Sequence, residues 1–185
     1  MTAPFPSSAP SVLAETDAAR VTVMAPRARL SLRVRGELAA LNGALGLTLP
    51  GRIGARTATG GLEALRLGPD EWMLHCAEDA AAPVIEAAAS VYEAHPHSLV
   101  DVSGREVSFL IEGPRAAELL TLGCPRDIDA IAVGEGRRTL FDGATVILWR
   151  DGEAAFRMDV WNSFAAHLAH LLEIGCRELA AEAAS

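Results

Sequence analysis

Residues 136–161 constrain the fold of this 185-residue chain more than any other segment. Three apolar runs, RRTLF, ATVILWR and AAFRMDVW, are separated by Asp142-Gly143 and by Asp151-Gly152. An Asp-Gly pair between alternating apolar residues is the strongest short-range signal for a β-hairpin. We therefore predict an antiparallel meander of three strands, with one turn at each Asp-Gly pair.

Strand and helix patterns alternate through the rest of the chain. Period-2 alternation predicts strands, helical spacing of apolar residues predicts helices, and a Gly- and Arg-rich stretch without a period predicts a long loop. The expected strands are 28–36, 62–67, 72–76, 98–103 and 106–113, the helices are 37–46, 78–95, 114–123 and a last one from Asn162 or Ser163, and the loop is 48–61.

This order predicts an α+β protein of antiparallel sheets covered by helices, built from two halves of the ferredoxin-like, split βαβ class. We place the halves at about 21–95 and 96–180, within one domain of residues 21–185. Residues 1–20, rich in Pro, Ser and Ala, are expected to form a flexible N-terminal tail.

Composition limits the function. The net charge is −8, and all 16 basic residues are Arg, so an acidic surface argues against nucleic-acid binding. The sequence has no signal-peptide pattern and no apolar run long enough to cross a membrane, which predicts a cytoplasmic protein. The widely spaced Cys76, Cys124 and Cys176 suit free buried thiols better than a disulfide framework or a metal knuckle.

The stretch DVSGRE places Asp101, Ser103, Arg105 and Glu106 close together. A nucleophilic serine would need a base nearby, and the Gly-x-Ser-x-Gly elbow is absent around Ser103. Asp and Ser at a strand end commonly bond the local backbone, so we interpret this cluster as a turn.

The histidines are the other candidate ligands. His167 and His170 lie three apart on a predicted helix, which can bring two imidazoles to one metal. His170 points away from the apolar stripe and no third ligand is evident, so we interpret both as surface or boundary residues. His95 and His97 border a loop, and a solvated boundary is their expected place.

Two further segments carry candidate contacts. Arg52 and Arg56, in the predicted loop, could hold an anion, although a simple connection is the alternative. Trp72 follows the acidic turn GPDE, and tryptophan is enriched at interfaces. We therefore predict a partner interface at Trp72 with Asp70 and Glu71, core packing of the ring being the alternative.

A family resemblance rests on LRLGPDEWMLHC and DVSGREVSFLIEGPRAAELLTLGCPRDI, together with the meander and the helix NSFAAHLAHLL. These stretches resemble the gamma subunit of heterotetrameric sarcosine oxidase, a family similar to the folate-binding aminomethyltransferases of the glycine cleavage system. The resemblance implies their fold. It also implies membership in a complex that oxidises sarcosine to glycine, with hydrogen peroxide and formaldehyde or 5,10-methylenetetrahydrofolate as the other products.

By the same resemblance, FAD, FMN, NAD and tetrahydrofolate belong to the large alpha and beta subunits, which a small delta subunit accompanies. Aminomethyltransferases carry acidic residues in the meander, whereas this chain has Val146, Ile147 and Leu148 there. We therefore assign no catalytic, cofactor-binding or metal-binding residue and expect an accessory subunit. The alternatives are a stand-alone folate-binding one-carbon protein and a subunit of a related N-methyl amine oxidase.

Overall fold

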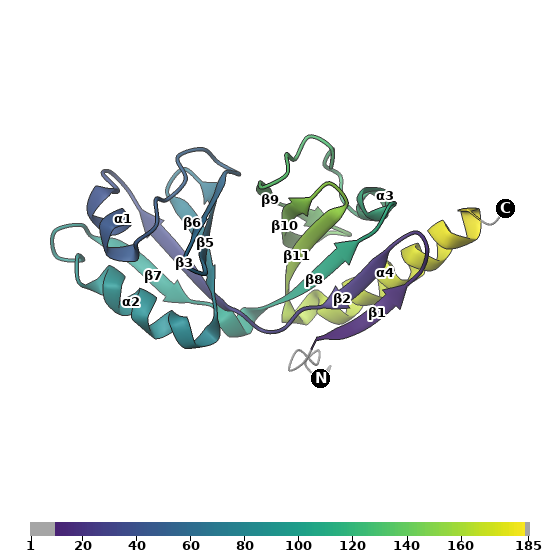
Figure 1. Cartoon of the computed structure of the whole chain (residues 1–185), viewed down its shortest axis with the longest axis horizontal. Coiled ribbons are helices and arrows are strands. Elements are labelled where there is room, and N and C mark those ends of the chain that lie inside the picture. The colour runs from purple at the N-terminus through teal and green to yellow at the C-terminus, as the bar shows by residue number, and fades with distance from the viewer. Residues whose placement is uncertain (1–9, 184–185) are drawn as a thin grey trace. The chain divides into compact units, whose positions relative to one another are not determined.

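The computed structural model describes residues 10–183, which form two compact units (Figure 1). The first unit combines the described residues up to Pro26 with those from Arg105 onward, and the second unit is Arg27–Gly104. The predicted halves, divided between residues 95 and 96, are therefore wrong in their bounds, because the first unit draws on both ends of the chain.

The second unit contains one five-stranded antiparallel sheet in the order β4-β5-β6-β3-β7. Its elements are β3 (Ala28–Val34), α1 (Ala39–Leu45), β4 (Arg56–Thr59), β5 (Leu62–Gly68), β6 (Glu71–Cys76), a 3₁₀ turn (Glu78–Ala80), α2 (Ala81–Ala89) and β7 (His97–Asp101). Without β4, the chain order β3-α1-β5-β6-α2-β7 and the sheet order β5-β6-β3-β7 are those of a ferredoxin-like unit.

The first unit contains a six-stranded antiparallel sheet in the order β1-β2-β8-β11-β10-β9. Its elements are β1 (Ser11–Glu15), β2 (Arg20–Val23), β8 (Glu106–Glu112), α3 (Ala116–Thr121), β9 (Gly136–Phe141), β10 (Ala144–Gly152), β11 (Ala155–Trp161) and α4 (Asn162–Ala183). A 3₁₀ turn (Ser103–Arg105) before β8 spans the boundary between the units. The order β10-β11-β8-β2 repeats that of the second unit, with β2 as the fourth strand.

The N-terminal segment is part of this sheet, which corrects the prediction of a flexible tail for residues 10–20. β2 pairs antiparallel with β8, opposing Val21 to Ile111 and Val23 to Phe109, and β1 pairs with β2. Val21 and Val23 are fully buried, so their removal from water stabilises the pairing. The tail prediction for residues 1–9 lies outside the described residues.

Two turn predictions were also tested. Asp142 and Gly143 have φ values of 46° and 78°, so they make the predicted turn between β9 and β10. The prediction of a turn at Asp151-Gly152 is wrong. β10 continues through Gly152, and the chain reverses at residues 153–154. The β10–β11 pairing is irregular between Arg150 and Gly152, where a bulge accommodates the extra residue.

The long loop predicted at 48–61 is wrong in its second part, where β4 pairs with β5. The two strands are joined by Gly60 and Gly61, whose φ values of 58° and 86° are accessible to glycine at no steric cost. A Gly-Gly hairpin therefore lies inside a stretch whose composition suggested irregular structure.

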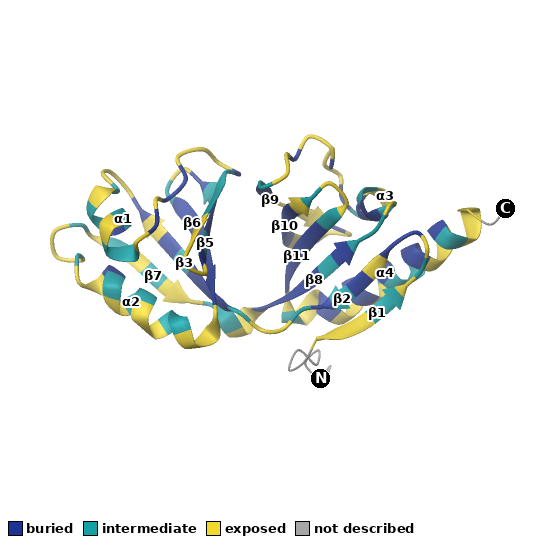
Figure 2. Ribbon diagram, viewed as in Figure 1, coloured by how far each residue is buried: buried dark blue, intermediate teal, exposed yellow. Residues whose placement is uncertain are grey.

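Each sheet has one face packed against helices. Apolar side chains from alternate strand positions meet α3 and α4 in the first unit, and α1 and α2 in the second. Figure 2 shows the buried positions along the strands and helices of both units. Phe109, Met158 and Leu168 are fully buried in the first core. The three cysteines are buried free thiols, as predicted. No helix within residues 10–183 combines the length and apolar character that a membrane span requires.

Candidate functional site

The turn between β5 and β6 carries the predicted interface residues. Asp70 accepts hydrogen bonds from Arg35 Nε at 2.9 Å and from one terminal nitrogen of Arg33 at 3.1 Å. The Arg35 bond, reinforced by Arg33, lowers the pKa of the Asp70 carboxyl below its ordinary value. The Glu71 carboxylate forms an ion pair with the second terminal nitrogen of Arg33, also at a distance of 3.1 Å. The acidic turn is thus held by two arginines of the β3 end.

Trp72 is 2% exposed and belongs to the core of the second unit. Its Nε1–H donates a hydrogen bond to the Pro50 carbonyl at 3.0 Å, and the Arg66 guanidinium lies 4.7 Å from the ring centroid. Because the ring is buried, a partner at this turn would meet Arg35, Asp70 and Arg66, which line a hollow of about 500 Å³ above it. The interface itself stays a prediction.

The two arginines predicted to contact an anion have different surroundings. Arg56, on β4, forms an ion pair with Glu63 on β5, with a distance of 3.2 Å between Nε and Oε1. Arg52 is exposed in the loop that precedes β4. Since Glu63 already neutralises Arg56, the pair offers a bound anion less attraction than two unpaired guanidinium groups would.

Asp101 and Ser103 form a turn, as predicted. The backbone N–H and hydroxyl of Ser103 both donate to Asp101 Oδ1, at 2.9 and 2.5 Å, and the Ser103 hydroxyl accepts the Arg29 N–H at 3.0 Å. These bonds from Ser103 lower the pKa of Asp101. Both polar groups therefore hold the local backbone at the end of β7.

Arg105 and Glu106, which follow in sequence, pair with each other at 2.8 Å. The Arg105 guanidinium also lies 5.4 Å from the ring centroid of Trp161. In this pairing Glu106 neutralises Arg105.

His167 and His170, the two histidines considered as metal ligands on α4, have different surroundings. His167 Nε2 lies 2.6 Å from Asp142 Oδ2, which links α4 to the β9–β10 turn, and His170 is exposed. His97 Nδ1 lies 2.7 Å from the His95 carbonyl, and its ring meets Tyr92 edge-on. Within residues 10–183, no three His, Cys, Asp or Glu side chains are placed to share a metal ion.

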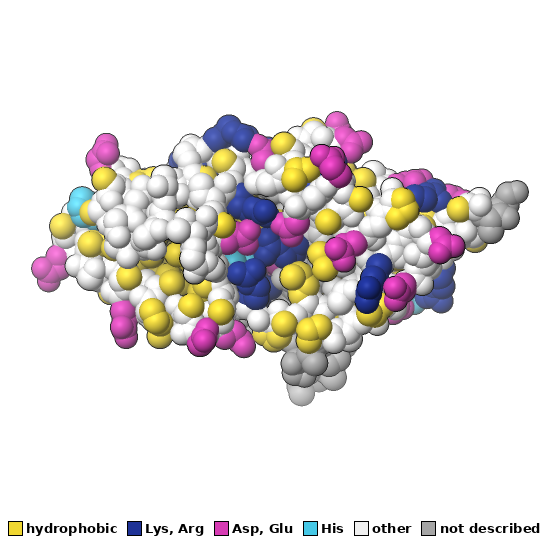
Figure 3. Space-filling model, in the orientation of Figure 1, with side chains coloured by type: hydrophobic (Ala, Val, Ile, Leu, Met, Phe, Trp, Pro, Cys, Tyr) yellow, Lys and Arg dark blue, Asp and Glu magenta, His cyan; other side chains and the backbone are white. Residues whose placement is uncertain are grey.

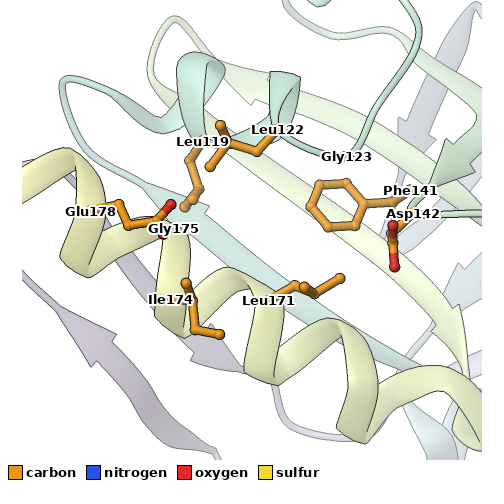
Figure 4. A pocket seen from close by; sticks show the side chains of 9 residues that line it. All are labelled: Leu119, Leu122, Gly123, Phe141, Asp142, Leu171, Ile174, Gly175 and Glu178. Atoms are coloured by element: carbon orange, nitrogen blue, oxygen red, sulfur yellow. The ribbon is translucent and has the colours of Figure 1, made fainter.

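A groove that the sequence analysis did not identify lies between α3 and α4 (Figure 4). We call it the α3–α4 groove, and it has a volume of about 340 Å³. It is lined by Leu119, Leu122, Gly123, Phe141, Asp142, Leu171, Ile174, Gly175 and Glu178. A glycine inside an otherwise regular apolar helix stripe, as at Gly175, was the available sequence signal.

Two ferredoxin-like units with these strand orders give the chain an α+β fold that is shared with an aminomethyltransferase. The glycine cleavage system aminomethyltransferase T from Bartonella henselae superimposes with a TM-score of 0.60 at 16% identity, over 79% of this chain and 43% of that protein. At this identity the likeness concerns the fold alone.

The particular family follows from the sequence. The family model described as sarcosine oxidase, gamma subunit family matches residues 35–177, and the chain belongs to this family. The gamma subunit of sarcosine oxidase from Corynebacterium sp. strain U-96 is 33% identical over 137 residues, which are 72% of this chain and 66% of that relative. The chain thus matches about two thirds of the length of that relative.

A solved structure agrees with this assignment. A chain of heterotetrameric sarcosine oxidase from Corynebacterium sp. U-96, in complex with pyrrole 2-carboxylate, matches with a TM-score of 0.79 at 30% identity. The match covers 90% of this chain and 88% of that chain. The family resemblance and the α+β fold predicted from the sequence are confirmed.

Proposed function

We propose that this chain is the gamma subunit of a heterotetrameric sarcosine oxidase and acts there as an accessory, non-catalytic subunit. The observation that supports this most strongly is the match, at a TM-score of 0.79 and over 90% of the chain, to a chain of the heterotetrameric enzyme. A likeness that extends over both units favours a whole subunit of the same kind.

The complex would remove the N-methyl group of sarcosine by oxidation. A flavin bound by a partner subunit would accept two electrons from sarcosine and pass them to O₂, so that sarcosine, water and O₂ would give glycine, formaldehyde and hydrogen peroxide. Where tetrahydrofolate takes the one-carbon unit, the product is 5,10-methylenetetrahydrofolate. In this proposal FAD, FMN, NAD and folate are bound by large alpha and beta subunits, and a small delta subunit completes the complex.

The polar groups of this chain support an accessory role. The Asp101 carboxylate and the Ser103 hydroxyl bond each other and the backbone, and Asp70 is occupied by Arg33 and Arg35. General acid–base or nucleophilic catalysis needs such groups within reach of a substrate. Here they stabilise turns instead, so the chemistry is assigned to the partner subunits.

The acidic character of the chain suits a protein partner. Asp and Glu side chains are scattered over the face visible in Figure 3, in keeping with the net charge of −8.

Three buried free thiols fit a reducing compartment, and we place the complex in the cytoplasm.

The test is affinity purification of the tagged full-length chain from its native host, with mass spectrometry of the eluate and its absorption spectrum. Two large chains, one small chain, a flavin spectrum and oxidation of sarcosine are the expected result. Assay of other N-methyl amines alongside sarcosine identifies the preferred substrate of the complex. A colourless, solitary protein would contradict the proposal, and saturable tetrahydrofolate binding by it would favour the stand-alone alternative.

A further inference from the structure

The α3–α4 groove is open because two glycines line it. A Cβ atom at Gly175 on α4 would lie 2.6 Å from a methyl carbon of Leu119 and 2.8 Å from one of Leu122. A Cβ atom at Gly123, just after α3, would lie 2.9 Å from the Phe141 ring. A side chain at Gly123 would collide with the Phe141 ring, and a side chain at Gly175 would require the methyl groups of Leu119 and Leu122 to move into the groove or away from α4.

The groove exposes apolar surface to water. Leu122, on its α3 side, is 57% exposed, and Leu171 and Ile174 on α4 are half-buried. In Figure 4 the side chains of Leu122, Leu171 and Phe141 surround the same opening. Water contact with such surface is unfavourable, so covering it would favour a complex, less the costs of association.

The rim of the groove is acidic. Glu178 borders it on α4 and forms no ion pair with any residue of the described chain. Asp142 borders it on the β9–β10 turn and is bound to His167. Near the end of α4, Arg115 is already shared between Glu118 and Glu182. An occupant with positive charge is therefore favoured over a neutral or acidic one.

The lining also distinguishes a macromolecule from a small ligand. Small-molecule sites combine an apolar cavity with several convergent polar groups that fix the orientation of the ligand. In this groove the side-chain polar groups are two rim carboxylates, one of them already bound to His167. An apolar side chain inserted from a protein segment needs an apolar lining and does not need several convergent polar groups.

We propose that the α3–α4 groove receives an apolar side chain from a partner-subunit segment that carries Arg or Lys beside it, with Glu178 as the facing charge. This inference rests on the proposed function, since the partner is a subunit of the same complex. It assigns the docking surface to the helix side of the first unit.

Leu122→Glu in the assembled complex is the principal variant, because the exposed Leu122 can be changed without opening the core. We expect its affinity for the partner subunits to fall by about tenfold or more, as for interface anchors. Leu140→Glu is the matched control: Leu140 is 44% exposed, and on β9 it faces away from Phe141. We expect less than about a twofold effect there.

Charge is tested separately. Glu178→Arg should weaken assembly more than Glu178→Gln, and the difference between the two variants should shrink as salt rises. Equal effects of the two variants at all salt concentrations would overturn the basic character of the occupant.

A photo-crosslinking residue in place of Leu122 identifies the occupant directly. A crosslink to an apolar partner-subunit peptide flanked by Arg or Lys supports the proposal. A crosslink to a second copy of this chain or to its own residues 1–9, or no crosslink in an intact complex, overturns it. If the wild-type chain joins no complex, the proposed function fails as well, whereas an intact complex that is indifferent to Leu122→Glu overturns the groove alone.

Discussion

The Arg66 guanidinium lies over the indole of Trp72, 4.7 Å from the ring centroid. Arg66 also donates hydrogen bonds to the carbonyls of Gly51, Gly68 and Pro69, while Trp72 donates to the carbonyl of Pro50. The two residues thereby join the loop before β4 to the β5–β6 turn. The turn that carries the predicted interface is therefore fixed by the core beneath it.

Trp72→Phe should lower the free energy of unfolding by about 1–2 kcal/mol, because the substitution leaves the Pro50 carbonyl without its buried donor. Trp72→Ala should cost about 3–5 kcal/mol through the cavity it creates. Urea unfolding followed by far-UV circular dichroism measures both. Trp161→Phe, at a ring that is 45% exposed, is the control and should change stability by less than about 0.5 kcal/mol. Equal effects at Trp72 and Trp161 would contradict the role of the Pro50 bond.

Asp70 should make stability depend on pH in the acidic range. Its pKa is lowered in the folded chain by Arg35 and Arg33, so its contribution is present above the ordinary aspartate pKa and is lost as the pH falls through the folded value. The difference in melting temperature between wild type and Asp70→Asn should therefore be largest near neutrality and shrink below about pH 4.

Glu93→Gln is the control for Asp70→Asn, because Glu93 is exposed and forms no ion pair among the described residues. The difference in melting temperature between Glu93→Gln and wild type should stay small at each pH. A constant Asp70→Asn difference from neutral to acidic pH would show that the arginine contacts do not stabilise the ionised carboxylate.

Gly113→Ala should be strongly destabilising. Gly113 has a φ of 127°, and a Cβ atom there would lie 2.8 Å from Ala19 Cα and 2.9 Å from the Ala18 carbonyl oxygen. These are backbone atoms that cannot turn away, so we expect a loss of at least about 2 kcal/mol. Gly104→Ala is the matched control, since nothing lies within 4 Å of its Cβ position and its φ is not in the left-handed region. Thermal unfolding of the two variants should differ clearly, and similar melting temperatures would contradict the close approach.

Ser103→Ala should affect stability and leave turnover unchanged. It removes the hydroxyl bonds to Asp101 and to the Arg29 N–H, which should cost about 1 kcal/mol or somewhat more. In the assembled complex kcat should stay within about twofold of wild type, as should kcat of the control Ser98→Ala on the exposed side of β7. A loss of several hundredfold in kcat with assembly intact would establish Ser103 as part of the catalytic machinery.

Much of the fold could be predicted from local patterns. The strands β3, β5, β6 and β8, the Asp142-Gly143 turn and the apolar stripe of α4 are confirmed by the structure. β4 was missed because the Gly60-Gly61 pair lay inside a stretch without periodicity. The second Asp-Gly turn was wrong because the bulge near Arg150 let β10 run two residues longer.

The site was less predictable. Trp72 follows an acidic turn, which suggested an interface anchor, yet the structure buries its ring beneath Arg66. The α3–α4 groove was missed, because it requires Gly175 of one helix to lie against Leu119 and Leu122 of another. Such packing is a relation between distant residues, and a local pattern does not contain it.

The sequence by itself determined the family and most of the helices and strands outside β1, β2 and β4, because these depend on short-range periodicity and on matched motifs. Only the tertiary structure decided that β2 completes the first sheet beside β8, which joins the two ends of the chain into one unit. Tertiary structure also decided that Trp72 is covered and Leu122 is not. Strand partners and solvent exposure are set by the burial of apolar surface between segments far apart in sequence, and this energy belongs to the packed molecule.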